Sequence, residues 1–199
     1  MKILSILVSK PKTVQYRGNS VSTGIFKDAI PGPVMLRTLN LDGDGQADLK
    51  VHGGPDKALY GYPNDAYGQW KVTRPKDSFP FGAMGENLSF DYLPEDTIYV
   101  GDTFQLGDAV VQAAQPRFPC FKLGIKFNDP SILKQFMKLG RPGVYFRVIK
   151  EGLVDVGDEL KLLTQDSGMF SISEFFGMIN GSPIDSHRLH EILKIKALP

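Results

Sequence analysis

The spread of turn-forming residues limits the fold more than any other feature of this sequence. Twenty-one glycines and fourteen prolines are distributed along the whole 199-residue chain and do not gather in one segment. Residues that interrupt helices this often leave room mainly for short strands joined by tight turns. With 42% hydrophobic and 23% charged residues, the chain has the balance of a packed domain and not of a disordered one. The sequence therefore predicts a mainly β protein.

The predicted strands are short apolar or alternating runs bounded by Gly, Pro, Asn or Ser. They cover Lys2–Val8, Val21–Phe26, Val34–Leu41, Thr97–Val100, Thr103–Leu106, Ala109–Gln115, Val144–Lys150 and Glu159–Leu163. Two similar segments, Val100–Leu106 and Val156–Leu162, each show a Gly-Asp turn that leads into an alternating strand. Because this repeat occurs only twice, it favours a barrel or sandwich over a solenoid. We predict a β-barrel domain over residues 1–163.

Helical insertions and a helical tail are predicted around this sheet. Asn64 precedes a helix over 65–72, and Asp129 followed by Pro130 begins another that ends at Gly140. In the tail, Ser171 with Glu174 three residues later has the spacing of a capping box, and Asp185 precedes a second short helix. Since about 35 residues cannot hold an independent core, residues 164–199 should pack on the barrel.

Charge and cysteine content exclude several classes of protein. The net charge of +1 lacks the basic excess of proteins that bind nucleic acid non-specifically. No apolar run approaches the ~20 residues of a membrane span, and the first eight residues are too short for a signal peptide. A single cysteine, Cys120, excludes an intrachain disulfide and fits a reducing compartment. We expect a cytoplasmic protein with no nucleic-acid or membrane partner.

Two glycine-containing loops are candidate binding elements. In His52-Gly53-Gly54-Pro55-Asp56-Lys57 the glycines let the backbone approach a ligand, and an acid and a cation follow. Chemistry alone leaves a ligand loop and a structural turn equally open. Glu86 and Asn87 after Gly85 are a weaker signal, because they also suit a plain turn.

Cys120 is the candidate nucleophile or metal ligand. It lies between two prolines that stiffen the loop, with Arg117 and Lys122 near it in sequence. Nearby cations favour the thiolate, which is the form that attacks and binds metals. The alternative is a buried, inert cysteine, which free cysteines often are.

Taken together, these motifs and their order resemble those of a MOSC domain, the C-terminal domain of molybdenum cofactor sulfurases, and most closely its small free-standing YiiM-like bacterial subgroup. The segments that carry the likeness are His52–Ala58, Gly85–Leu88, Gly101-Asp102 and Gln115–Leu123. Supporting segments are Arg17-Gly18, Thr23–Ile25, Gly43–Asp48 and Gly140–Gly143. The likeness covers most of the chain. It differs at Phe121, where a tryptophan is common in the family.

This resemblance implies a β-barrel like that of the pyruvate kinase barrel domain, which binds molybdenum cofactor (molybdopterin) and ligates molybdenum through Cys120. The implied reaction is the reduction of small N-hydroxylated substrates such as hydroxylaminopurines and amidoximes. By the same likeness Asp56 would line the pocket as a catalytic residue beside Cys120. It is a candidate proton donor or substrate orienter, because removing an oxygen as water consumes protons. The implied cofactor-binding residues are Arg17, His52, Gly53, Gly54, Lys57, Glu86, Asn87, Arg117 and Lys122. No iron–sulfur, flavin or nicotinamide motif is present, so the resemblance also implies an external electron-donor reductase, and it leaves a homodimer open.

Two other roles fit the same resemblance. Cys120 could carry sulfur as a persulfide, in which case the chain would work with a desulfurase. Alternatively, the chain could bind the cofactor and protect it without catalysis. Bound metal, labile sulfur and turnover distinguish the three roles.

Overall fold

The computed structural model describes residues 1–47 and 53–199. Its strands are β1 (Ile3–Val8), β2 (Lys12–Tyr16), β3 (Asn19–Thr23), β4 (Asp28–Ile30), β5 (Val34–Leu36), β6 (Leu59–Pro63), β7 (Leu88–Phe90), β8 (Thr103–Leu106), β9 (Ala109–Pro116), β10 (Val144–Lys150), β11 (Gly152–Val154) and β12 (Leu160–Thr164). Its helices are the 3-10 turn η1 (Pro55–Lys57), α1 (Asp65–Thr73), α2 (Phe121–Lys126), α3 (Ser131–Leu139), α4 (Ile172–Ile179) and α5 (Ser186–Ile192). His52 lies outside the described residues.

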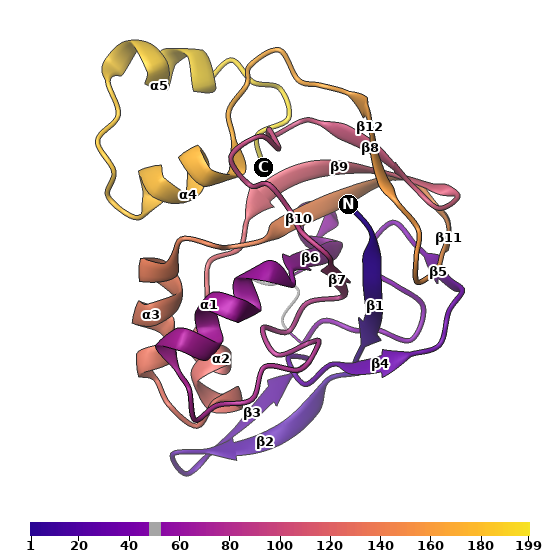
Figure 1. Ribbon diagram of the computed structural model, residues 1–199, viewed down its shortest axis with the longest axis vertical. Coiled ribbons are helices and arrows are strands. Elements are labelled where there is room, and N and C mark those ends of the chain that lie inside the picture. Colours follow the sequence, from indigo (N-terminus) through magenta and orange to yellow (C-terminus); the bar gives the residue numbers. More distant parts are fainter. Residues whose placement is uncertain (48–52) are drawn as a thin grey trace.

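One mixed sheet of eight strands dominates the fold (Figure 1). Its order is β12-β8-β9-β10-β6-β7-β1-β4, and all neighbours are antiparallel except β6 and β7. The start of β1 also meets the start of β12, because Lys2 forms an isolated bridge with Glu159 and the Leu160 amide donates to the Met1 carbonyl at 2.8 Å. The sheet therefore curls back towards itself. A closed barrel is not confirmed, since β12 and β4 remain the two ends of the strand order.

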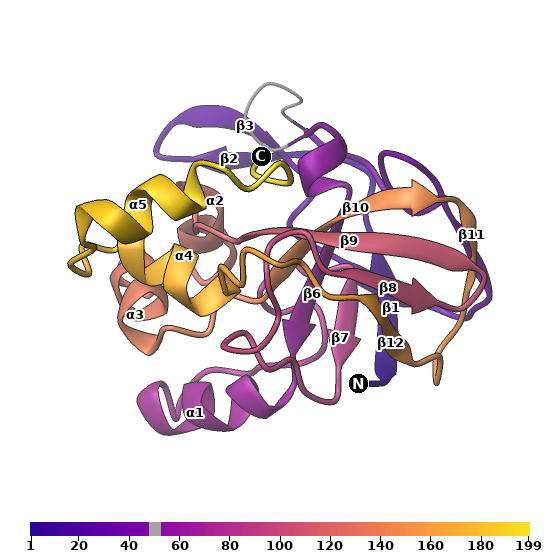
Figure 2. The same cartoon turned by 90° about the horizontal axis from the view of Figure 1, so that it is seen from above.

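Two smaller sheets flank the large one. β2 and β3 form a hairpin in regular antiparallel register, and β5 pairs with β11. The hairpin projects from the body of the molecule beside α2, as both ribbon views show (Figures 1 and 2).

Two apolar clusters hold the fold. The first fills the inside of the curled sheet, where Phe104 and Phe146 meet edge to face at 6.2 Å between ring centres. The second lies between β6 and the helices α1, α2 and α3. There, buried Trp70 donates its indole N–H to the Tyr62 hydroxyl at 2.7 Å, so this apolar site leaves neither polar atom unpaired.

The tail helices begin where the sequence predicts. The Ser171 hydroxyl accepts the Glu174 amide at 3.0 Å, and the Asp185 carboxylate accepts the Arg188 amide at 2.8 Å. Arg188 also bonds both carboxylate oxygens of Glu174 at 2.7 Å, which ties α5 to α4. Ile192 is buried in the same apolar cluster as the sheet. The division into domains at residue 163 stays a prediction.

Several predicted strands differ from the structure. Residues 97–100 form no regular strand, because the amides of Thr97 and Ile98 bond the Pro94 carbonyl and Tyr99 forms only an isolated bridge with Ser171. Of the runs predicted at 21–26 and 34–41, only 21–23, within β3, and 34–36, which is β5, are strands. The strand β6 was not predicted from the sequence, because its Gly61 and Pro63 are typical turn residues. Gly61 is needed there because a Cβ would lie 2.8 Å from the Phe90 ring.

The segment after Cys120 also differs from expectation. The prolines predict a stiff loop, whereas residues 121–126 form α2, with Cys120 as the residue that precedes its first turn. Within the described residues, none of the helices has the length and apolar character needed to cross a membrane.

Ile192→Ala tests whether the tail shares one cooperative core with the sheet. Because this side chain is 2% exposed among sheet residues, we expect the free energy of unfolding to fall by about 2–4 kcal/mol in a single transition. Leu193→Ala, at a side chain 67% exposed, is the matched control and should change it by less than about 0.5 kcal/mol. Urea denaturation followed by circular dichroism measures both. A separate low-stability transition for the tail would contradict the expectation.

Candidate functional site

A cavity of about 100 Å³ lies where the hairpin base, the turn at 44–47, β6 and the Cys120 segment meet. Its lining residues are Thr23, Gly24, Ile25, Lys27, Asp44, Gly45, Gln46, Ala47, Lys57, Tyr60, Gly85, Asn87, Arg117, Phe118, Cys120, Lys122 and Tyr145. Four of these side chains are basic and one is acidic. A small cavity with this excess of positive charge suits an anionic ligand.

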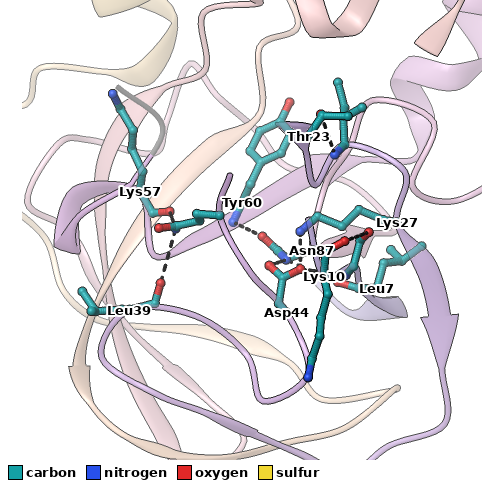
Figure 3. A network of polar contacts seen from close by, with 12 residues as sticks. Leu7, Lys10, Thr23, Lys27, Leu39, Asp44, Lys57, Tyr60 and Asn87 are labelled. Atoms are coloured by element: carbon teal, nitrogen blue, oxygen red, sulfur yellow. Dashed lines mark hydrogen bonds and ion pairs between the residues drawn. The ribbon is translucent and has the colours of Figure 1, made fainter. Parts of the chain in front are cut away.

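Asp44 organises one wall of the cavity (Figure 3). Its Oδ1 accepts from the Lys27 ammonium at 2.5 Å and from the Ser9 amide at 2.8 Å, while its Oδ2 accepts from the Asn87 side chain at 2.8 Å. The Asn87 oxygen in turn accepts the Tyr60 amide at 3.2 Å. The Lys27 and Asp44 side chains are only 7% and 2% exposed. Burial lowers the pKa of Lys27, and the Asp44 carboxylate opposes this shift.

Arg117 is a buried cation that follows β9 directly. Its guanidinium donates to the Met84 carbonyl and lies 4.9 Å from the ring centre of Tyr60. Contacts on several sides leave this side chain little freedom to reorient, so its charge is preorganised at the cavity. Burial raises the pKa of both Tyr60 and Tyr145, which keeps these two phenols protonated at neutral pH.

Cys120 is half-buried and lines the cavity together with Arg117 and Lys122. Its sulfur is close enough to Arg117 and Tyr145 to interact with both electrostatically. A thiol among basic groups offers one soft donor for a thiophilic metal and several cations for anionic ligands around that metal.

The structure brings some of the predicted site residues together and places others elsewhere. Lys57, Asn87, Arg117, Cys120 and Lys122 all line the cavity. The predicted residues that do not line it are Arg17, Gly53, Gly54, Asp56 and Glu86. His52 cannot be placed, because it lies outside the described residues.

Glu86 is fully buried behind the cavity wall. Its carboxylate accepts bonds from the Tyr67 hydroxyl and the Gly82 amide at 2.6 Å, the Ser89 hydroxyl at 2.8 Å and the Met84 amide at 3.1 Å. Four donors saturate the carboxylate. Glu86 therefore shapes the loop that carries Met84 and, through it, supports Arg117.

Asp56 lies in η1 after Gly54, whose φ of +91° favours glycine. Its carboxylate is ion-paired with Arg147 of β10, which also donates to the Gln112 side chain at 3.0 Å. This pairing ties η1 to the sheet, next to the lining residue Lys57.

Lys27, Asp44, Tyr60 and Tyr145 are cavity residues that the sequence reasoning missed. Asp44 lies in Gly43–Asp48, a segment that resembles the family, and this signal could have identified it. For Lys27 and the two tyrosines the sequence offers no motif, because only folding brings them to the cavity.

Lys126 links α2 to a segment that lines the cavity. Its ammonium donates to the carbonyls of Ile25 at 3.0 Å and Gly82 at 2.5 Å, which joins α2 to the segment after β3. Burial lowers the pKa of Lys126 to about 8, with Arg117 and Lys27 adding to the shift and Glu86 opposing it.

Lys126→Met should reveal this burial as a pH dependence of stability. Below pH 8 the amine is protonated in both states, so its desolvation destabilises the folded state fully. Between pH 8 and 10.5 only the unfolded chain keeps the proton, so the wild type should gain stability relative to the variant, by at most about 3.4 kcal/mol. Denaturation from pH 7 to 10.5 measures the difference. Lys138→Met, at an exposed lysine of α3, is the matched control, and a Lys126→Met profile that does not change with pH would contradict the assignment.

Comparisons with known proteins agree on one family. The family model described as "MOSC domain" matches residues 48–161. The chain is 42% identical over 180 residues to the protein YflK of Bacillus subtilis, which covers 89% of this chain and 80% of that protein. It is 37% identical over 178 residues to protein YiiM of Escherichia coli, covering 88% and 79%.

A fungal protein and a solved structure extend the comparison. A protein of Gibberella moniliformis named "Reductase" is 32% identical over 181 residues, which cover 89% of this chain but only 32% of that protein. The crystal structure of YiiM from Geobacillus stearothermophilus superposes with a TM-score of 0.82 at 31% identity, covering 100% of this chain and 93% of the other.

Proposed function

The chain belongs to the MOSC domain family, and on that premise we propose that it is an oxidoreductase that binds molybdenum cofactor and reduces N-hydroxylated compounds. The observation that carries the proposal is the meeting of the single thiol, Cys120, with four basic side chains in one small cavity. The fungal relative named as a reductase supports redox chemistry in this family.

The described lining residues fit the chemistry of such a cofactor, which is a pterin dithiolene with a phosphate tail. Cys120 would ligate the metal, because thiolates are soft ligands suited to thiophilic metals. Lys57, Arg117 and Lys122 would hold the anionic groups by charge-assisted hydrogen bonds. When bound, the cofactor supplies the two-electron redox chemistry.

The chain's own residues hold the cationic groups in place and supply protons for the reaction. The Lys27–Asp44 pair and the Met84 carbonyl fix cationic groups before any ligand binds. Reduction of R–NHOH to R–NH₂ breaks the N–O bond, takes up two electrons and two protons and releases water. Those protons need donors at the site. The hypothesis for one donor is Asp56, which the resemblance assigns to the pocket and which lies next to the lining residue Lys57 in the chain.

We propose that the electrons come from a separate reductase. The chain has one cysteine, too few to hold an iron–sulfur cluster by cysteine ligands.

Turnover tests the proposal directly. Protein from a host that makes molybdenum cofactor should reduce acetamidoxime with reduced methyl viologen as artificial donor. Cys120→Ser should lower the rate at least about a hundredfold, because a hydroxyl is a poor ligand for a thiophilic metal. Lys138→Met, on the exposed face of α3, should keep the wild-type rate. Cofactor-loaded protein that reduces nothing would overturn the enzyme proposal and leave a passive cofactor carrier.

Asp56→Asn tests the proton-donor hypothesis. If the carboxyl donates a proton to the reaction, turnover should fall at least about tenfold and its pH dependence should change. Arg147→Gln removes the ion pair but keeps the carboxyl, so it isolates the effect of positioning. Full turnover with an unchanged pH profile in Asp56→Asn would show that the hypothesis is wrong.

A further inference from the structure

The β2–β3 hairpin stands beside the cavity without joining the large sheet. Its two strands pair with each other and with no other strand in the described parts of the chain. Thr23, the last residue of β3, lines the cavity, so the base of the hairpin is anchored at the site. Figures 1 and 2 both show the rest of the hairpin extending along the side that carries α2.

The hairpin touches α2 through an aromatic pair. The ring of Tyr16, at the end of β2, lies 6.4 Å from the ring of Phe121 with 35° between the ring planes. The Arg17 guanidinium lies over the Tyr16 ring at 5.2 Å. Arg17, which the resemblance assigns to the cofactor, thus supports an aromatic side chain outside the cavity lining.

Phe121 is an exposed aromatic side chain between two cavity-lining residues. Its side chain is 48% exposed, yet its two neighbours in the chain, Cys120 and Lys122, both line the cavity. Covering an aromatic face that is open to water with another ring lowers the free energy. The rings of Tyr16 and Phe121 therefore lie outside the cavity lining, and Phe121 presents its exposed face between two residues that do line the cavity.

The lining of the cavity is rich in cations, which the proposed function assigns to the cofactor. With the cofactor held by these cations, an N–OH group that reaches Cys120 leaves the rest of its molecule facing outwards. The aromatic surface next to Cys120 is then the surface that this remainder meets.

We propose that Tyr16 and Phe121 form an aromatic platform that stacks the ring of planar N-hydroxylated substrates and selects them over aliphatic ones. The inference rests on the proposed function and names specificity-determining residues for it. Stacking is tolerant of ring identity because every heterocycle presents a π face. The platform therefore recognises the shape of the substrate and not a particular hydrogen-bond pattern.

Paired substrates test the platform in the cofactor-loaded enzyme. The ratio of kcat/KM for benzamidoxime to kcat/KM for acetamidoxime should fall about tenfold in Phe121→Ala, mainly through KM for benzamidoxime, which corresponds to about 1.4 kcal/mol. Tyr16→Ala should lower the ratio in the same direction, and Phe121→Trp should retain it. Tyr92→Ala is the matched control, because Tyr92 is 49% exposed and has no ring contact within the described residues. An unchanged ratio in both alanine variants would overturn the platform.

A binding measurement separates this inference from the proposed function. Saturation-transfer NMR on the oxidised, loaded protein reports benzamidoxime binding without turnover. The signal of its ring protons should fall about tenfold in Phe121→Ala and stay unchanged in Tyr92→Ala, even if no reduction is detected. Ring signals equal in wild type and Phe121→Ala would contradict the platform whatever the activity.

Discussion

The buried ion pair between Lys27 and Asp44 is the contact on which the rest of the site depends. Through Asp44 it joins the end of β1 at Ser9 and the start of β7 at Asn87 to the segment before β4. Taking both charges out of water is costly, and the cost is offset only where hydrogen bonds complete the carboxylate. Asp44 meets this requirement with three donors. The pair thus fixes the walls of the cavity without cancelling its positive charge.

Around that pair the fold brings cations from distant parts of the chain to one small space. Arg117 follows β9, Lys57 precedes β6 and Lys122 lies in α2, and Lys126 fastens α2 to the opposite wall. A cavity so built is preorganised for an anionic ligand. This arrangement is the physical basis for our proposal that the chain binds molybdenum cofactor.

Local signals predicted much of the structure. The hydroxyl of Ser171 and the carboxylate of Asp185 cap their helices as their spacing predicts, and Gly140 ends α3 with a φ of +71°. Val144–Lys150 forms β10 with the predicted bounds. These features depend on neighbours within a few residues, which the sequence shows directly.

Long-range contacts could not be predicted in the same way. Lys27 and Asp44 carry no motif that pairs them, and β6 contains a glycine and a proline that only its packing against Phe90 explains. Asp56 stands in a motif typical of the family, yet its ion pair with Arg147 depends on the approach of η1 to β10. The curling of the sheet likewise depends on the approach of β1 to β12, and no local pattern encodes that.

The metal and pterin content of the purified protein tests the central claim most directly. Wild type and Cys120→Ser are expressed in a host that makes molybdenum cofactor, and molybdenum, pterin and cyanide-labile sulfur are measured in both. We expect about one molybdenum and one pterin per wild-type chain, with the molybdenum lost in the variant. No molybdenum in either protein, with labile sulfur in the wild type alone, would contradict the account and identify Cys120 as a sulfur carrier.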